Sequence, residues 1–144
     1  MRAYVIDAST AIKWYIPEPL SKRATYFLDL AVEGQVTLMA PDLILPEIGN
    51  VLWKKVKRNE LSADEARAIV YAIAKEPPMR IVPSSTLLPG AMEIAVAYSR
   101  TVYDCLYVAL AASESAVLIT ADERLANSMQ NSVYADRIKY LGDA

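Results

Sequence analysis

The sequence predicts an α/β protein in which helices cover both faces of a parallel sheet. Short apolar strand patterns alternate with longer helical patterns along the chain, and this alternation is typical of parallel sheets. The chain has 144 residues, of which 54% are apolar, so it can form the core of one domain. No internal repeat or linker-like segment divides it. We therefore predict a single three-layer α/β/α domain over residues 1–144.

The first part of the chain contains two predicted strands. Residues 4–6 (YVI) form a short apolar strand, which ends at Asp7 and leads into a short helix. Residues 21–32 have apolar side chains at helical spacing, and Gly34 is well suited to end that helix. Residues 36–40 (VTLMA) then form the second strand.

Two helices and a third strand are predicted in the middle of the chain. Asp42 is a suitable N-cap for a helix that extends to about Arg58. Residues 62–65 (SADE) form a capping box, which predicts a second helix to about Lys75. Residues 80–82 (RIV) lie between prolines and form the third strand.

The last third of the chain continues the alternation. Ser85 or Thr86 is predicted to cap a helix whose inward face includes Met92, Ala95 and Val96. The next helix, residues 104–113, is apolar nearly all round and is therefore expected to be buried. The remaining elements are strands at 116–119 and 138–140 and a short helix between them that ends near Met129.

The composition excludes several kinds of chemistry. There is no histidine, which rules out Ser-His-Asp and Cys-His catalysis and most zinc sites. The single cysteine, Cys105, cannot form an internal disulfide. No apolar run approaches the ~20 residues of a membrane helix, and the N-terminus is predicted as a strand rather than a signal peptide. We therefore expect a cytoplasmic protein whose hydrolytic chemistry, if any, uses carboxylates, lysine, hydroxyls or an oxygen-bound metal.

Four acidic residues lie where predicted strands pass into helices or in the first turns of helices: Asp7, Glu47, Asp104 and Asp122. Open parallel sheets place their ligand sites at the carboxyl ends of the strands, so these side chains are expected along one edge. Two like charges ~5 Å apart repel by about 3 kcal/mol at an effective dielectric of ~20, which favours a bound cation. Carboxylate ligands without His or Cys favour Mg²⁺ or Mn²⁺.

Each of these acids also has a simpler structural explanation. Asp104 and Asp122 are favourable at helix N-termini because of the helix dipole. Asp7 suits a cap or turn, and Glu47 suits a solvated helix position. These explanations stay open for each residue alone, and it is the combination of four acids at one predicted edge that favours a metal site.

Nearby polar and basic residues fit the same edge. Three polar residues can hydrogen-bond a carboxylate or a metal-bound water, although each also suits a cap or surface position: Ser9, Asn50 and Thr120. Three lysines are candidates for RNA phosphate contacts: Lys13, Lys54 and Lys55. Cations near the C-terminus of a helix also complement its dipole, which is the alternative explanation for the lysines.

Taken in order, four segments resemble the PIN-domain family, and most closely its VapC-type toxins. The segments are VIDASTAIKW, PDLILPEIGNVL, YDCLYVALA and LITADERLA, and the resemblance extends over residues 4–127. It implies a five-stranded parallel sheet in the order 3-2-1-4-5. It also implies a Mg²⁺- or Mn²⁺-dependent endoribonuclease that cuts RNA, a cognate antitoxin protein and a homodimer.

By motif, the resemblance assigns catalytic and metal-binding roles to the four acids and supporting roles to the three polar residues named above. The expected mechanism is metal-assisted phosphodiester hydrolysis, in which the three aspartates hold one ion and Glu47 orients water or helps to hold a second ion. Two departures from the family pattern are present. Ala126 and Asn127 stand where some members carry a further acid, so the number of bound ions stays open, and the segment AYSRTVYD lacks a glycine often found there.

Two other Mg²⁺-using α/β families fit the sequence poorly. A haloacid-dehalogenase-like phosphatase requires DxD at the end of the first strand, whereas Ser9 occupies the third position. A response-regulator receiver requires an acid after the third strand, which ends in Val82 and Pro83. A PIN-like module that binds RNA or protein without cutting stays open as an alternative. Loss of one or more acids would mark such a module, and all four acids are present.

Overall fold

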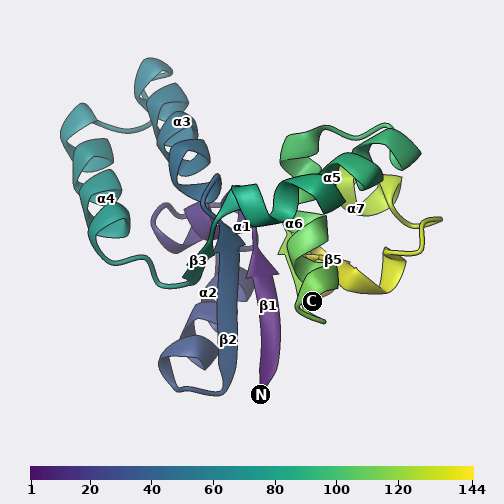
Figure 1. Cartoon of the computed structure of the whole chain (residues 1–144). Coiled ribbons are helices and arrows are strands. Elements are labelled where there is room, and N and C mark those ends of the chain that lie inside the picture. Colours follow the sequence, from purple (N-terminus) through teal and green to yellow (C-terminus); the bar gives the residue numbers. More distant parts are fainter.

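Five parallel strands form one sheet at the centre of the computed structural model, which describes residues 1–144 (Figure 1). The strands are β1 (Arg2–Ile6), β2 (Val36–Pro41), β3 (Arg80–Val82), β4 (Val117–Thr120) and β5 (Ile138–Tyr140). Their order in the sheet is β3-β2-β1-β4-β5, so the order that the resemblance implied is confirmed. The two strands that precede Asp7 and Asp122 are therefore neighbours at the centre of the sheet.

The register of the central strands explains why they are buried. Val5 lies opposite Met39 on one side and opposite Leu118 on the other, and all three side chains are almost fully buried. Ile6 and Ile119, the next pair along, are also inaccessible to solvent. Side chains alternate between the two faces of a strand, so a strand covered by helices on both faces must be apolar throughout.

Helices cover both faces of this sheet. The helical elements are α1 (Ala8–Ala11), η1 (Ile12–Trp14), α2 (Ser21–Val32), α3 (Ile44–Lys57), α4 (Ala63–Lys75), α5 (Ser84–Tyr98), α6 (Val102–Ser113), α7 (Glu123–Ser128), η2 (Ala135–Arg137) and η3 (Leu141–Asp143). In Figure 1, α2 lies behind the sheet, α5 and α6 lie in front of it, and α3 and α4 extend beyond the carboxyl ends of the strands. No helix is long and apolar enough to cross a membrane.

The helix predicted to be buried is α6. Every residue from Cys105 to Ala111 is buried, because α6 packs over β1, β2 and β4 on one side and against α5 on the other. A helix enclosed in this way has no solvent face, which explains its nearly continuous apolar sequence. Only its two ends are accessible to solvent, and the first turn carries Asp104.

The predicted capping box of α4 was correct, whereas the caps predicted for α3 and α5 were wrong. Ser62 and Glu65 form the predicted capping box of α4. Asp42 does not cap α3: its backbone N–H donates to Val82 O, which continues the β2–β3 pairing, and its carboxylate accepts a hydrogen bond from Ser84. The N-cap of α5 is Pro83 rather than a hydroxyl residue, so α5 begins earlier than predicted.

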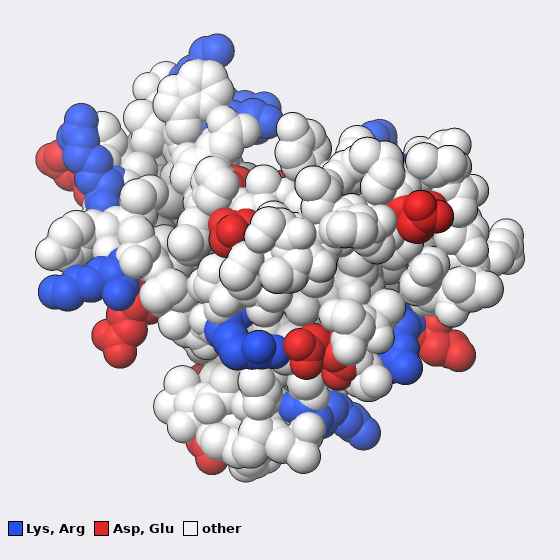
Figure 2. All heavy atoms as spheres, in the orientation of Figure 1, with Lys and Arg blue, Asp and Glu red and all other residues white.

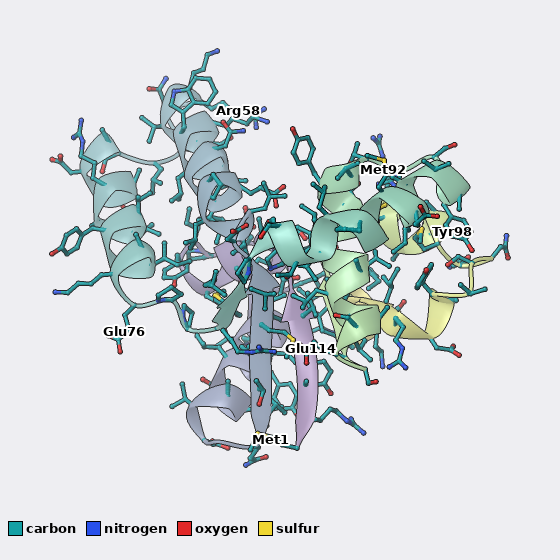
Figure 3. All side chains as sticks on the ribbon, in the orientation of Figure 1. Met1, Arg58, Glu76, Met92, Tyr98 and Glu114 are labelled. Atoms are coloured by element: carbon teal, nitrogen blue, oxygen red, sulfur yellow. The ribbon has the colours of Figure 1, made fainter.

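The predicted inward face of α5 was wrong for two of its three residues. Ala95 is partly buried against the core, whereas Met92 is 47% exposed and Val96 is 77% exposed. The buried residues of α5 are Leu87, Ala91 and Ile94. Figure 3 labels Met92 at the surface of α5. This helix carries apolar residues on both of its sides, so helical spacing alone does not indicate which side faces the sheet.

Candidate active site

A cavity of about 500 Å³ opens at the carboxyl ends of β1 and β4, between α1, α3, α6 and α7. All four predicted acids line it: Asp7, Glu47, Asp104 and Asp122. Figure 2 shows acidic surface at the bottom of the recess between α3 and the α5 side of the molecule, and Figure 3 shows side chains that extend into it from both sides. The topology therefore brings four separate segments of the chain to one place, as expected for an open parallel sheet.

Asp7 is the most buried of the four acids, at 7% exposure. It ends β1 and is the N-cap of α1, where its Oδ1 accepts hydrogen bonds from Thr10 N (3.1 Å) and Ser9 Oγ (2.6 Å). Its Oδ2 accepts a hydrogen bond from Thr120 Oγ1 at 2.5 Å. Burial raises the pKa of Asp7 above its ordinary value, and the hydrogen bonds from Ser9, Thr120 and Thr10 oppose that shift. The carboxylate is thus held rigidly where a negative charge is costly.

Asp122 occupies the equivalent position after β4. It is the N-cap of α7, and its Oδ1 accepts hydrogen bonds from Arg124 N (3.0 Å) and Leu125 N (3.3 Å). Its own backbone N–H donates to Thr120 Oγ1 at 3.0 Å. Since Thr120 also donates to Asp7, one hydroxyl links the two strand ends that carry these acids.

Glu47 reaches the cavity from the first turn of α3. Its Oε1 accepts a hydrogen bond from the hydroxyl of Tyr107, which lies on α6. Burial raises the pKa of Glu47, the hydrogen bond from Tyr107 lowers it, and the nearby charges of Asp7 and Asp104 raise it further. The carboxylates of Asp7, Glu47 and Asp104 therefore share one electrostatic environment.

Asp104 lies in the first turn of α6, which begins after the N-cap Thr101. Its Oδ2 forms a 2.9 Å ion pair with Nη2 of Arg100, four residues earlier in the chain. Arg100 is the one cation that forms an ion pair with any of the four acids. In the absence of another cation, this pair compensates part of the negative charge at the cavity wall.

The donor set of the cavity suits a hard divalent cation. The acids supply carboxylate oxygens, and the chain contains no histidine that would favour zinc. The side chains do not form a preassembled group of three or more His, Cys, Asp or Glu ligands. Burial makes the charged forms of Asp7 and Glu47 costly, and the nearby charges of Asp7 and Asp104 add to that cost for Glu47. A Mg²⁺ or Mn²⁺ ion would offset that cost.

The three predicted supporting residues have different surroundings. Ser9 and Thr120 both donate to Asp7, and Ser9 Oγ also accepts a hydrogen bond from Ala121 N at 3.0 Å. Asn50 lines the cavity one turn beyond Glu47 but is exposed and makes no hydrogen bond to an acid. Two of the three are thus part of the hydrogen-bond network around Asp7.

The three predicted lysines also have different surroundings. Lys54 is exposed and lines the cavity. Lys13 and Lys55 instead form ion pairs with Glu18, at 3.2 Å and 2.9 Å, and Lys55 also approaches Glu60. The charges of Lys13 and Lys55 are therefore largely neutralised within the protein, and Lys54 alone presents an unpaired charge to the cavity.

Sequence reasoning missed two residues that contact the acids. Tyr107 follows Asp104 by three positions, so both project from one side of α6. Its position within a buried apolar helix concealed the polar role of its hydroxyl group. Arg100 precedes Asp104 by four positions, and this spacing between opposite charges was a sequence pattern that could have revealed the pair.

The fold and the cavity define an α/β protein with an acidic site at the carboxyl edge of a parallel sheet. The chain belongs to the PIN-domain family, whose model matches residues 4–128. A relative from Pyrobaculum aerophilum named ribonuclease VapC3 is 33% identical over 123 residues, which are 85% of this chain and 91% of the relative. The predicted resemblance to VapC-type proteins is thereby confirmed.

Solved structures of VapC proteins share the fold. One is VapC20 of Mycobacterium tuberculosis, described as a toxin that cleaves the sarcin–ricin loop, with 15% identity and a TM-score of 0.63 over 87% of this chain and 94% of that chain. Another is VapBC2 of Rickettsia felis bound to a promoter DNA fragment, with 13% identity and a TM-score of 0.63 over 96% of this chain and 98% of that chain. These similarities establish the five-stranded PIN-like architecture.

Proposed function

We propose that this protein is a Mg²⁺- or Mn²⁺-dependent endoribonuclease and the toxin of a VapBC-type toxin–antitoxin pair. The observation that carries the proposal is the cavity in which Asp7, Glu47, Asp104 and Asp122 meet at the carboxyl ends of the central strands. Membership of the PIN-domain family and a ribonuclease-named relative support it. The proposed cellular location is the cytoplasm.

The chain's own residues have distinct proposed roles in phosphodiester hydrolysis. Asp7, Asp104 and Asp122 would hold the ion, and Glu47 orients the attacking water or contributes to a second ion. When bound, the ion supplies positive charge that polarises the scissile phosphate and makes water a better nucleophile. Ser9 and Thr120 keep the Asp7 carboxylate in a fixed orientation through their hydrogen bonds.

RNA must approach this acidic cavity through a favourable contact. Lys54 lines the cavity without an acidic partner, so it is the proposed phosphate contact. Asn50, exposed on the same helix, is a candidate for hydrogen bonds to the RNA strand. Lys13 and Lys55 contribute less because both pair with Glu18 and Lys55 also approaches Glu60.

Two protein partners follow from the same assignment. A cognate antitoxin is proposed because the similar Rickettsia felis structure is named as a VapBC2 assembly. A homodimer is proposed because three exposed apolar residues of α5 form a row at four-residue spacing: Leu88, Met92 and Val96. Exposed apolar rows of this kind are typical of surfaces that other protein chains cover.

An RNA cleavage assay tests the proposed activity directly. The wild-type protein should cut single-stranded or looped RNA with Mg²⁺ or Mn²⁺ and lose this activity in EDTA. Asp7→Asn should fold but not cleave, since it removes a charged ligand while it keeps the size of the side chain. A wild-type protein that binds RNA without cutting it under any of these conditions would favour the non-catalytic PIN-like module instead.

A further inference from the structure

Glu47 and Tyr107 form a contact between α3 and α6 that the proposed mechanism does not use. The Tyr107 ring is 3% exposed, and its hydroxyl donates to Oε1 of Glu47, sixty residues away in sequence. Both residues line the cavity. No other hydrogen bond or ion pair reaches the Glu47 carboxylate.

The other three acids are oriented mainly by their own segments. Asp7 and Asp122 are N-caps held by backbone N–H groups of the helices they begin, and Asp7 also accepts a hydrogen bond from Thr120 at the adjacent strand end. Asp104 is paired with Arg100, four residues earlier in the chain. Glu47 has the longest of the four side chains, with more torsional freedom, and depends on a residue from a different helix.

We propose that Tyr107 is a positioning residue that holds Glu47 in the orientation required for metal binding. Tyr107 occupies Oε1, so Oε2 is left without a protein partner and is available to an ion or its water. Helix α6 then contributes to the site twice, through the Asp104 carboxylate and through the orientation of Glu47. This inference rests on the proposed metal-dependent function.

A purely structural role for Tyr107 would have a different signature. In that case the ring fills the core between α6 and the sheet, and phenylalanine would serve equally well. Phenylalanine keeps the ring and removes only the hydroxyl, so Tyr107→Phe should fold. It would leave the half-buried Glu47 carboxylate free to adopt several orientations. Partners that orient metal ligands in this way typically change metal affinity by about 10- to 100-fold when removed.

Mn²⁺ binding measured by calorimetry without RNA separates these two roles. Tyr107→Phe should bind Mn²⁺ about tenfold more weakly than the wild type. In cleavage assays the Mn²⁺ concentration for half-maximal rate should rise, while the KM for RNA should stay unchanged. The matched control is Tyr26→Phe, which removes the hydroxyl of an exposed tyrosine on α2 and should leave Mn²⁺ affinity unchanged.

A double-mutant cycle shows whether Tyr107 acts through Glu47. In a Glu47→Gln background, Tyr107→Phe should cause little further loss of Mn²⁺ affinity, because the contact partner is already altered. Two results would overturn the inference while leaving the ribonuclease proposal intact. One is an equal loss of Mn²⁺ affinity from Tyr107→Phe in the wild-type and Glu47→Gln backgrounds, and the other is wild-type Mn²⁺ affinity in Tyr107→Phe. A wild-type protein that neither binds Mn²⁺ nor cleaves RNA would overturn both.

Discussion

The hydroxyl of Thr120, at the end of β4, donates a 2.5 Å hydrogen bond to Oδ2 of Asp7, at the end of β1. The same hydroxyl accepts a hydrogen bond from the backbone N–H of Asp122. A second bond runs from Thr10 Oγ1, on α1, to Ile119 O, on β4, at 3.1 Å. These bonds hold the two central strand ends together, so the separation of Asp7 and Asp122 is set by the sheet and not by loops.

Replacing Thr120 by valine should destabilise the protein by about 1–3 kcal/mol, because Asp7 and the Asp122 N–H each lose a partner. Urea unfolding monitored by circular dichroism measures this difference. Thr37→Val on β2 provides a control with the same change of side chain at a half-buried strand position. If both variants lose equal stability, the hydroxyl of Thr120 has no special role.

Stability should depend on pH in the metal-free protein. The pKa values of Asp7 and Glu47 are raised in the folded state, mainly by burial, so the folded protein binds their protons more readily than the unfolded chain. Stability in EDTA should therefore increase as pH falls from neutrality towards the ordinary carboxyl values of about 4. The lowered pKa of Glu18 acts in the opposite direction, but only near and below the ordinary glutamate value of about 4.3.

Denaturant titrations in EDTA across this pH range measure the effect. Asp7→Asn and Glu47→Gln should each show a weaker pH dependence, because each lacks one titrating carboxyl group. Saturating Mn²⁺ should stabilise the wild type at neutral pH, by about 2.7 kcal/mol at a concentration 100-fold above Kd. It should also reduce the increase in stability that acidification causes, because the ion binds the deprotonated carboxylates. Stability that falls steadily between pH 8 and 5 in EDTA would contradict the assignment of raised pKa values.

Lys54 and Lys55 are adjacent in sequence but should contribute differently to RNA binding. In an Asp7→Asn background, which keeps RNA uncut, Lys54→Gln should weaken binding and reduce its salt dependence by about 0.7 in the log–log slope. Lys55→Gln should change this slope much less, since Lys55 is paired with Glu18 and Glu60. Fluorescence anisotropy at several salt concentrations measures the RNA affinity and the salt slope of each variant. Equal effects of Lys54→Gln and Lys55→Gln would show that the two lysines do not differ in RNA binding.

The exposed row on α5 should mediate self-association. Val96→Glu should shift the protein from dimer to monomer in size-exclusion chromatography with light scattering. Val96 is 77% exposed, so the charge should change the stability of the monomer by no more than about 0.5 kcal/mol. Val32→Glu on α2, where the valine is 79% exposed, is the matched control and should leave the association unchanged. A dimer that persists in Val96→Glu would assign the interface elsewhere.

Local sequence patterns determined the elements and the positions of the acids. The strand at 80–82 and the helix at 21–32 match the observed β3 and α2, because their apolar spacing and their proline and glycine boundaries act over a few residues. The junction positions of Asp7 and Asp122 are local features of the same kind. Parallel strands then bring such junctions to one edge, which is why the grouping of the acids could be predicted.

Tertiary packing decided which side chains meet. Tyr107 contacts Glu47 and Lys55 contacts Glu18 only after segments far apart in sequence are packed together, and no local pattern encodes such a pairing. The sequence could not determine which side of α5 is buried, because both of its sides carry apolar residues. Only the position of the sheet decides which side packs against the core. Short-range backbone preferences therefore established the scaffold and its acidic edge, whereas long-range packing established the partners that orient and neutralise its charges.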